Sequence, residues 1–121
     1  MKRDINLFIQ DILGSIKDIE IFSKGLTKEK FTSNKLKQNA IIRSLEIIGE
    51  ATKNIPDSFR EKYLDVPWKK IAGFRDILSH AYFGVSMDRV WNIIEKDLPI
   101  LKEEIKKIKI AENKSKTVKQ L

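Results

Sequence analysis

Residues 35–54 read KLKQNAIIRSLEIIGEATKN, and this stretch decides the fold class. Its apolar residues recur at helical spacing in two rows, one of Leu36, Ala40, Ile47 and Ala51 and one of Ile41, Ile42, Leu45 and Ile48. A helix that is apolar this far round lies between several neighbours or at a subunit interface. Gly49 within it permits another backbone to approach closely. The stretch therefore predicts a central helix of an all-α domain.

The segment before this helix predicts a second one. Apolar residues recur every three or four positions over residues 4–24, and Gly25 ends the pattern. Residues 27–33 then form a short polar link with one apolar anchor, Phe31. A serine or an asparagine at the end of this link caps the central helix.

The segment after the central helix predicts further helical pieces. Asp57 caps a short helical turn, and Pro67 starts a helix over residues 68–82. A last helix follows, with a kink or a break at Asp97 and Pro99.

Four long helical units with short links predict an antiparallel four-helix up-and-down bundle with an extra short helix. We expect residues 1–110 to form one domain and residues 111–121 to form a basic, flexible tail.

Composition excludes several kinds of site. The chain has 121 residues, a formal charge of +7, no cysteine and one histidine, His80. Without cysteine it forms no disulfide, no Cys-containing zinc site and no cysteine nucleophile, and one histidine excludes a metal site that needs two from the same chain. From Lys102 onward seven lysines stand against three glutamates, so this end supplies +4 of the charge. These lysines mostly form a solvated face, and they could add non-specific affinity for RNA that falls with salt.

Nothing in the sequence predicts export or a membrane. The N-terminus is polar where a signal peptide is apolar, and no run approaches the roughly 20 apolar residues of a membrane helix. We expect a cytoplasmic protein.

Residues 75–82, RDILSHAY, bring four functional side chains into two helical turns. Asp76 and His80 are one turn apart on the same face, and Arg75 and Tyr82 are seven residues apart on nearly the same face. A guanidinium holds phosphate and an imidazole moves protons near neutral pH. RNA supplies its own nucleophile, the 2′-hydroxyl. If imidazoles fill both the acid and the base role, the single His80 requires a site on a two-fold axis.

Each of these residues also has an ordinary structural interpretation. A lone histidine on a helix is often packed or solvent-facing, Asp76 can pair with His80 or a lysine, and Tyr82 can be a core aromatic. Spacing alone leaves both interpretations open.

The same stretch matches the R-x4-H-x-Y motif of HepT-like proteins, a branch of the HEPN superfamily. Residues 43–51 resemble that family's second-helix signature, residues 67–73 its lead-in to the motif, and residues 82–99 its closing segment. Together the blocks cover residues 4–108.

The resemblance implies a small helical bundle that forms a homodimer, with the two motifs facing a shared cleft. It implies the toxin of a two-gene toxin–antitoxin module, of type II or VII, that acts as a metal-independent ribonuclease. The implied partners are RNA and an MntA-like nucleotidyltransferase antitoxin, which transfers AMP to the motif tyrosine. On this resemblance Arg75 binds phosphate, His80 transfers protons, Asp76 orients the pair and Tyr82 accepts AMP.

Four further residues are candidates for a supporting role. Arg43, Glu46 and Glu50 form a polar cluster that orders the bundle or braces Arg75, and Ser79 lies beside His80 at a variable position of the motif. Glu46 and Glu50 are spaced like carboxylate metal ligands, but a di-iron bundle needs Glu-x-x-His pairs. We expect no metal and no cofactor. The alternative function is a non-catalytic helical protein that binds a nucleotide or a partner.

Overall fold

We describe a computed structural model of the chain, which covers the backbone of residues 4–79 and 87–120 and the side chains of residues 4–76 and 87–114. Every regular element in these ranges is helical, in the order α1 (Ile5–Ser23), α2 (Lys28–Ser33), α3 (Lys35–Lys53), α4 (Asp57–Arg60), α5 (Trp68–Ala72), α6 (Phe74–Ser79), α7 (Met87–Asn92), a π-helical turn η2 (Ile93–Asp97) and α8 (Leu98–Gln120). The predicted all-α class is confirmed. The up-and-down order of four helices, and the domain boundary at residue 110, stay predictions.

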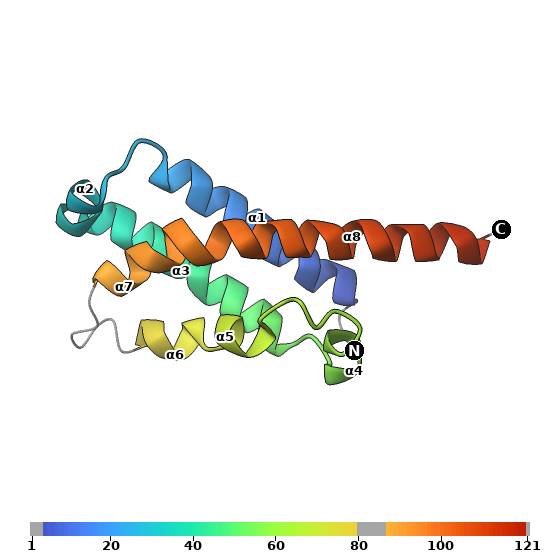
Figure 1. Cartoon of the computed structure of the whole chain (residues 1–121). Coiled ribbons are helices and arrows are strands. Elements are labelled where there is room, and N and C mark those ends of the chain that lie inside the picture. The colour runs from blue at the N-terminus through green and yellow to red at the C-terminus, as the bar shows by residue number, and fades with distance from the viewer. Residues whose placement is uncertain (1–3, 80–86, 121) are drawn as a thin grey trace.

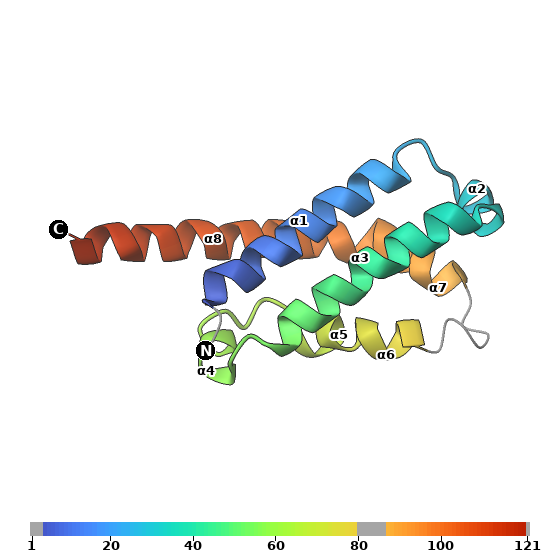
Figure 2. The same cartoon turned by 180° about the vertical axis from the view of Figure 1, so that it is seen from behind.

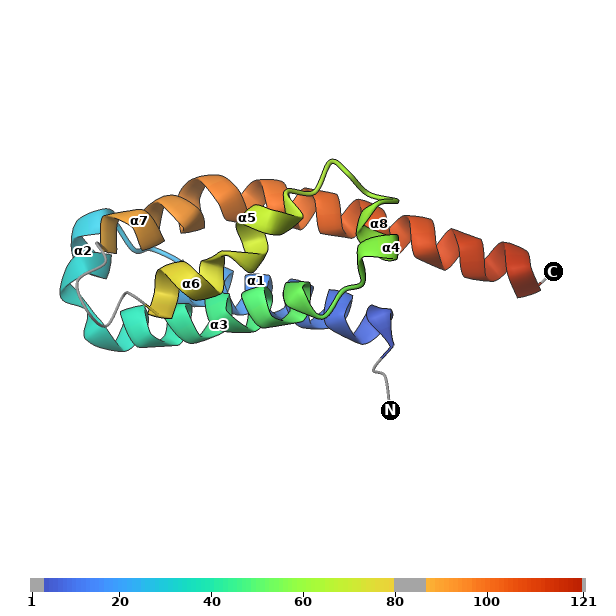
Figure 3. The ribbon, with the colours of Figure 1, turned by 90° about the horizontal axis from the view of Figure 1, so that it is seen from below.

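The helices pack in an elongated body (Figure 1). Helices α1 and α3 lie side by side, as the view from behind shows (Figure 2), and α8 packs against α1. Seen from below, α5 and α6 lie between α3 and the rod formed by α7 and α8 (Figure 3), and both contact α3. Helix α3 is therefore the central element, as its two apolar rows predict.

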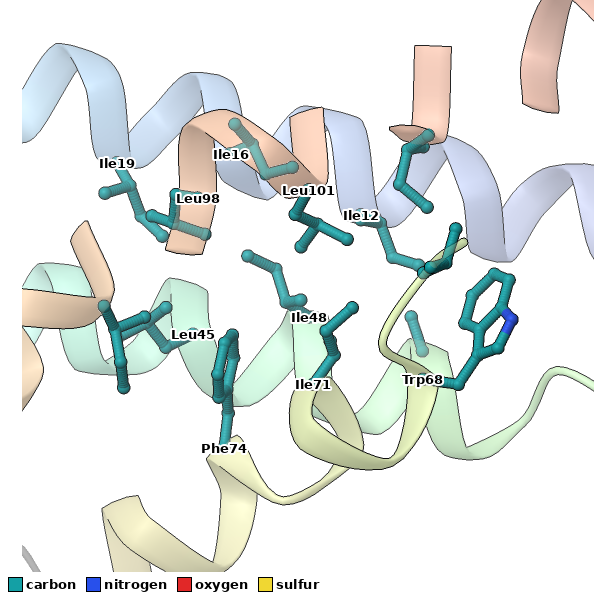
Figure 4. Close-up of a cluster of buried hydrophobic side chains, with 14 of the residues drawn as sticks. Ile12, Ile16, Ile19, Leu45, Ile48, Trp68, Ile71, Phe74, Leu98 and Leu101 are labelled. Atoms are coloured by element: carbon teal, nitrogen blue, oxygen red, sulfur yellow. The ribbon is translucent and has the colours of Figure 1, made fainter. Parts of the chain in front are cut away.

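One core joins the helices (Figure 4). Every described helix contributes to it, and the side chains from α1, α3, α5, α6 and α8 include Ile12, Ile16, Ile19, Leu45, Ile48, Trp68, Ile71, Phe74, Leu98 and Leu101. The apolar row that contains Leu36 and Ile47 is less buried than the other row of α3, because Leu36 is 79% exposed and Ile47 is half-buried. Part of this central helix thus faces away from the core.

The predicted polar link before α3 is wrong in one respect. It contains a helix of its own, α2, whose first turn is capped by Thr27, since its Oγ1 accepts from the Lys30 amide at 3.2 Å. The anchor Phe31 is fully buried and packs against Trp91, with ring centroids 5.4 Å apart. Of the two predicted caps for α3, Asn34 performs the role and accepts from the Lys37 amide at 3.0 Å.

The predicted helix over residues 68–82 is also corrected. It is broken at Gly73 into α5 and α6. The Gly73 amide donates to Lys69, and the Asp76 amide donates to the Gly73 carbonyl at 3.1 Å. Ile71 of α5 and Phe74 of α6, on either side of this turn, are both buried in the core. Asp57 likewise is no cap, because it is the first residue of α4 and Pro56 takes the cap position.

The irregularity predicted at Asp97 and Pro99 takes the form of the π-helical turn. The Leu98 amide donates to the Ile93 carbonyl, five residues back. Pro99 has no amide hydrogen for the next regular bond, so a wider turn here accommodates it without breaking the rod. Lys70 of α5 binds Asp97 in this turn at 2.9 Å.

The C-terminal segment, for which we predict a basic, flexible tail over residues 111–121, has regular backbone in the structure. The backbone stays helical to Gln120, and α8 projects beyond the rest of the body past α4 (Figure 1). Glu112 ties the root of this projection to the segment between α4 and α5, because it accepts a hydrogen bond from the Tyr63 hydroxyl and lies 3.2 Å from Lys62 Nζ. Burial and this bond together raise the pKa of Tyr63 to about 12.

Candidate functional site

Arg75 lies at the start of α6, where the chain leaves the core. The preceding residue, Phe74, is 1% exposed and points into the core (Figure 4). Arg75 is turned about 100° from it around the helix, and its side chain is 53% exposed. Burial of one residue thus fixes the outward direction of the next.

Gly49 sets the distance between α3 and α6. A Cβ atom at this position would lie 3.2 Å from the Arg75 backbone nitrogen and 3.4 Å from the Arg75 Cβ. The 3.2 Å spacing to the backbone nitrogen is tighter than ordinary van der Waals contact. The expectation that Gly49 permits close approach of another backbone is confirmed, and the approaching backbone is that of the motif arginine.

Glu50, the next residue of α3, pairs with Arg75. Its Oε2 lies 2.8 Å from Arg75 Nη1, and both side chains are about half exposed. Arg43 and Glu46, one turn earlier, form a separate pair at 3.3 Å. The expected polar cluster therefore consists of two ion pairs on one face of α3, of which one braces Arg75.

A groove of about 470 Å³ runs over this face. Its walls come from α1, α3 and the segment after it, and α6, and are formed by Phe8, Asp11, Arg43, Glu46, Ile47, Glu50, Ala51, Asn54 and Arg75. Arg75 and all three residues of the polar cluster line the same groove. This is the feature that joins the candidate residues into one site.

Five of the groove residues were not among the candidate site residues of the sequence, namely Phe8, Asp11, Ile47, Ala51 and Asn54. The i, i+3 spacing of Phe8 and Asp11 places them on one side of α1, but an amphipathic pattern does not say which neighbour that side meets. The packing of α1 against α3 brings them to Arg75.

The remaining motif residues are only partly described. Asp76 is exposed, in the first turn of α6. Ser79 closes α6, with its side chain outside the described residues, and His80 and Tyr82 lie outside them altogether. Their roles stay predictions.

No three carboxylate or imidazole groups within the described side chains are placed to hold a metal ion. In the described ranges, no helix combines the length and apolarity needed to cross a membrane.

The fold and the groove define a small all-α protein with an exposed, ion-paired arginine beside a mixed polar and apolar groove. The family description that matches the sequence is "Ribonuclease HepT-like", over residues 12–108. The chain belongs to this family, as the motif and the three flanking blocks indicate.

Relatives of known name support the same family. The "Gamma-glutamylcyclotransferase and putative RNase" of Methanocaldococcus jannaschii is 47% identical over 98% of this chain and 54% of the relative, so the chain spans about half of that protein. A shorter "Putative RNase" of the same organism is 45% identical over 86% of the chain and 95% of the relative. The "Probable ribonuclease HepT" of Thermococcus cleftensis is 42% identical over 90% and 99%. No solved structure matches the chain significantly.

Proposed function

We propose that this chain is a ribonuclease toxin of a two-gene toxin–antitoxin module, which cleaves RNA without a metal ion at a site shared by two subunits. The observation that carries the proposal is the exposed guanidinium of Arg75, braced by Glu50 and set against Gly49 at the groove. Membership of a family described as ribonucleases, and relatives named as RNases, support the activity.

The proposed reaction uses the 2′-hydroxyl of RNA as the nucleophile. His80 removes its proton, the oxygen attacks the neighbouring phosphorus, and the 5′-oxygen of the next nucleotide leaves with a proton that the protonated imidazole of the second subunit supplies. Arg75 stabilises the extra negative charge on the phosphate oxygens in the transition state. Asp76 orients the His80–Arg75 pair. The expected products carry a 2′,3′-cyclic phosphate and a 5′-hydroxyl.

With imidazoles in both the proton-acceptor and the proton-donor role the site is composite, because one chain supplies one imidazole. In the proposed regulation, an MntA-like nucleotidyltransferase places AMP on Tyr82. A bulky, negatively charged group seven residues from Arg75 would compete with RNA phosphate for that guanidinium.

The second candidate is a non-catalytic helical protein that binds a nucleotide or a partner through the same groove. The Arg75–Glu50 pair is compatible with this second candidate, since a guanidinium held by a carboxylate can bind an anionic ligand without catalysing a reaction.

Purified protein, freed of any antitoxin and treated with a chelator, tests the first candidate. We expect RNA cleavage that falls at least about 100-fold in Arg75→Ala and in His80→Ala. Arg89→Ala is the matched control, because Arg89 is an exposed arginine of α7 outside the groove. Full cleavage by His80→Ala, or products with a 3′-hydroxyl, would contradict the mechanism.

Tight binding of RNA or nucleotide without cleavage, and growth arrest on expression that neither variant relieves, would favour the second candidate.

A further inference from the structure

The charges that line the groove argue against a phosphate deep inside it. Three carboxylates, Asp11, Glu46 and Glu50, line it against two guanidiniums, so its walls carry an excess of one negative charge. Both guanidiniums already lie within 3.3 Å of a carboxylate oxygen. A phosphate placed among these groups would be repelled by carboxylates, whereas Arg75 can meet one where its half-exposed side chain faces solvent.

The same carboxylates suit a neutral ring that carries N–H groups. An ionised carboxylate accepts hydrogen bonds and donates none, and it recognises the exocyclic amino group of a base. Asp11 on α1 and Asn54 after α3 contribute a carboxylate acceptor and an amide to the lining of the groove. Uracil is the poorest match, because two carbonyl acceptors flank its one imino N–H.

The apolar part of the lining suits a flat ring as well. Phe8 and Ile47 are half-buried and line the groove together with Ala51. An aromatic side chain offers a surface on which a base of single-stranded RNA can stack. A groove of about 470 Å³ has room for such a ring and its ribose.

We propose that this groove is a base subsite, which binds the nucleotide next to the phosphodiester held by Arg75 and favours adenine, cytosine or guanine over uracil. The proposal rests on the ribonuclease function above and deepens it. Phe8 stacks on the base, and Asp11 accepts from its amino group. Neither residue takes part in the chemical step.

The test is the cleavage pattern on a short RNA pool of random sequence, read by sequencing the ends. We expect the wild-type chain to cut next to amino-bearing bases about three to ten times more often than next to uracil. Asp11→Asn should bring this ratio close to one, because the amide can also donate to uracil carbonyls. Phe8→Ala should raise KM about threefold to tenfold with kcat little changed.

Two residues of α1 outside the groove provide matched controls. Asp18→Asn removes an exposed carboxylate, and Phe22→Ala removes a half-buried aromatic side chain. Both should keep the wild-type base ratio and KM. Thermal unfolding of all four variants shows whether Phe8→Ala is folded. If it is not, Phe8→Leu replaces it, since leucine keeps most of the side-chain volume but has no aromatic ring.

A binding measurement separates this proposal from the function it rests on. Adenosine and uridine 3′-monophosphates are titrated against the chain, and affinity is measured by calorimetry. Tighter binding of the adenine nucleotide that is lost in Asp11→Asn supports the subsite even if no RNA is cut. RNA cleavage with no base preference, unchanged in Asp11→Asn and Phe8→Ala, would overturn the subsite and leave the ribonuclease standing.

Discussion

Arg75 of α6 and Glu50 of α3 form an ion pair beside the close approach of Gly49 to the Arg75 backbone, with 2.8 Å between Nη1 and Oε2. The ion pair holds the Arg75 guanidinium at the groove. It also engages that guanidinium with a carboxylate. A phosphate that binds Arg75 must compete with the Glu50 carboxylate.

Removal of the Glu50 charge should therefore strengthen RNA binding. We expect Glu50→Gln to bind RNA severalfold more tightly at low salt, with stability within about 1 kcal/mol of wild type because the pair is half exposed. Fluorescence anisotropy with a labelled oligonucleotide measures this. Glu29→Gln removes an exposed carboxylate on α2 and controls for the change in net charge. Weaker RNA binding by Glu50→Gln would show that Glu50 contributes more by positioning Arg75 than by competing with RNA phosphate.

Gly49 and Gly14 form a matched pair of helical glycines. A Cβ at Gly49 meets the Arg75 backbone at 3.2 Å, whereas nothing lies within 4 Å of a Cβ at Gly14. We expect Gly49→Ala to lower stability by about 1 kcal/mol net and to reduce cleavage further by moving α6. Gly14→Ala should raise stability by about 0.5–1 kcal/mol. Thermal unfolding of both variants measures these changes in stability. An equal gain in stability in both would contradict the close approach of Gly49 to the Arg75 backbone.

Tyr63 gives the chain a defined response to alkaline pH. The unfolded side chain ionises near pH 10, whereas the folded one stays neutral to about 12. Stability should fall as the pH rises from about 10 to 12, because the unfolded state loses a proton that the folded state keeps. In Tyr63→Phe this component should disappear, and in Tyr82→Phe it should persist. Denaturant unfolding between pH 8 and 12 measures the difference, and parallel curves for wild type and Tyr63→Phe would contradict it.

The projecting end of α8 should contribute non-specific affinity for RNA. A chain that ends after Asn113 keeps the contact between Glu112 and Tyr63 and loses Lys114, Lys116 and Lys119. We expect the slope of log affinity against log salt to become shallower by about 2, with the cleavage pattern unchanged. The full chain with arginine at the three positions should keep the wild-type slope. An unchanged slope after truncation would show that these lysines do not contact RNA.

The shared site can be tested by mixing subunits. If each site needs both copies of His80, a mixture of equal parts wild type and His80→Ala should retain about one quarter of the activity after subunit exchange. If each site is complete within one chain, the mixture should retain about one half of the activity of the same amount of wild-type protein. Light scattering on the same mixtures checks that exchange produces dimers.

Much of the fold follows from local pattern. The period of residues 35–54 predicts the central helix, Phe31 is a buried anchor, and Asn34 caps α3, because spacing and capping act within a few residues. The break at Gly73 was not predicted, since an isolated glycine in a helical pattern does not show by itself whether the helix continues through it. The helical end of α8 was also missed, because a stripe of lysines shows no packing partner in the sequence.

By itself the sequence determined the all-α class, the family and the motif that contains Arg75. The tertiary structure decided that Arg75 pairs with Glu50, that Gly49 faces the Arg75 backbone, and that Phe8 and Asp11 share its groove. The reason is physical. Helical periodicity states which side of a helix is buried, but the neighbour on that side is chosen when several helices pack their side chains into one core.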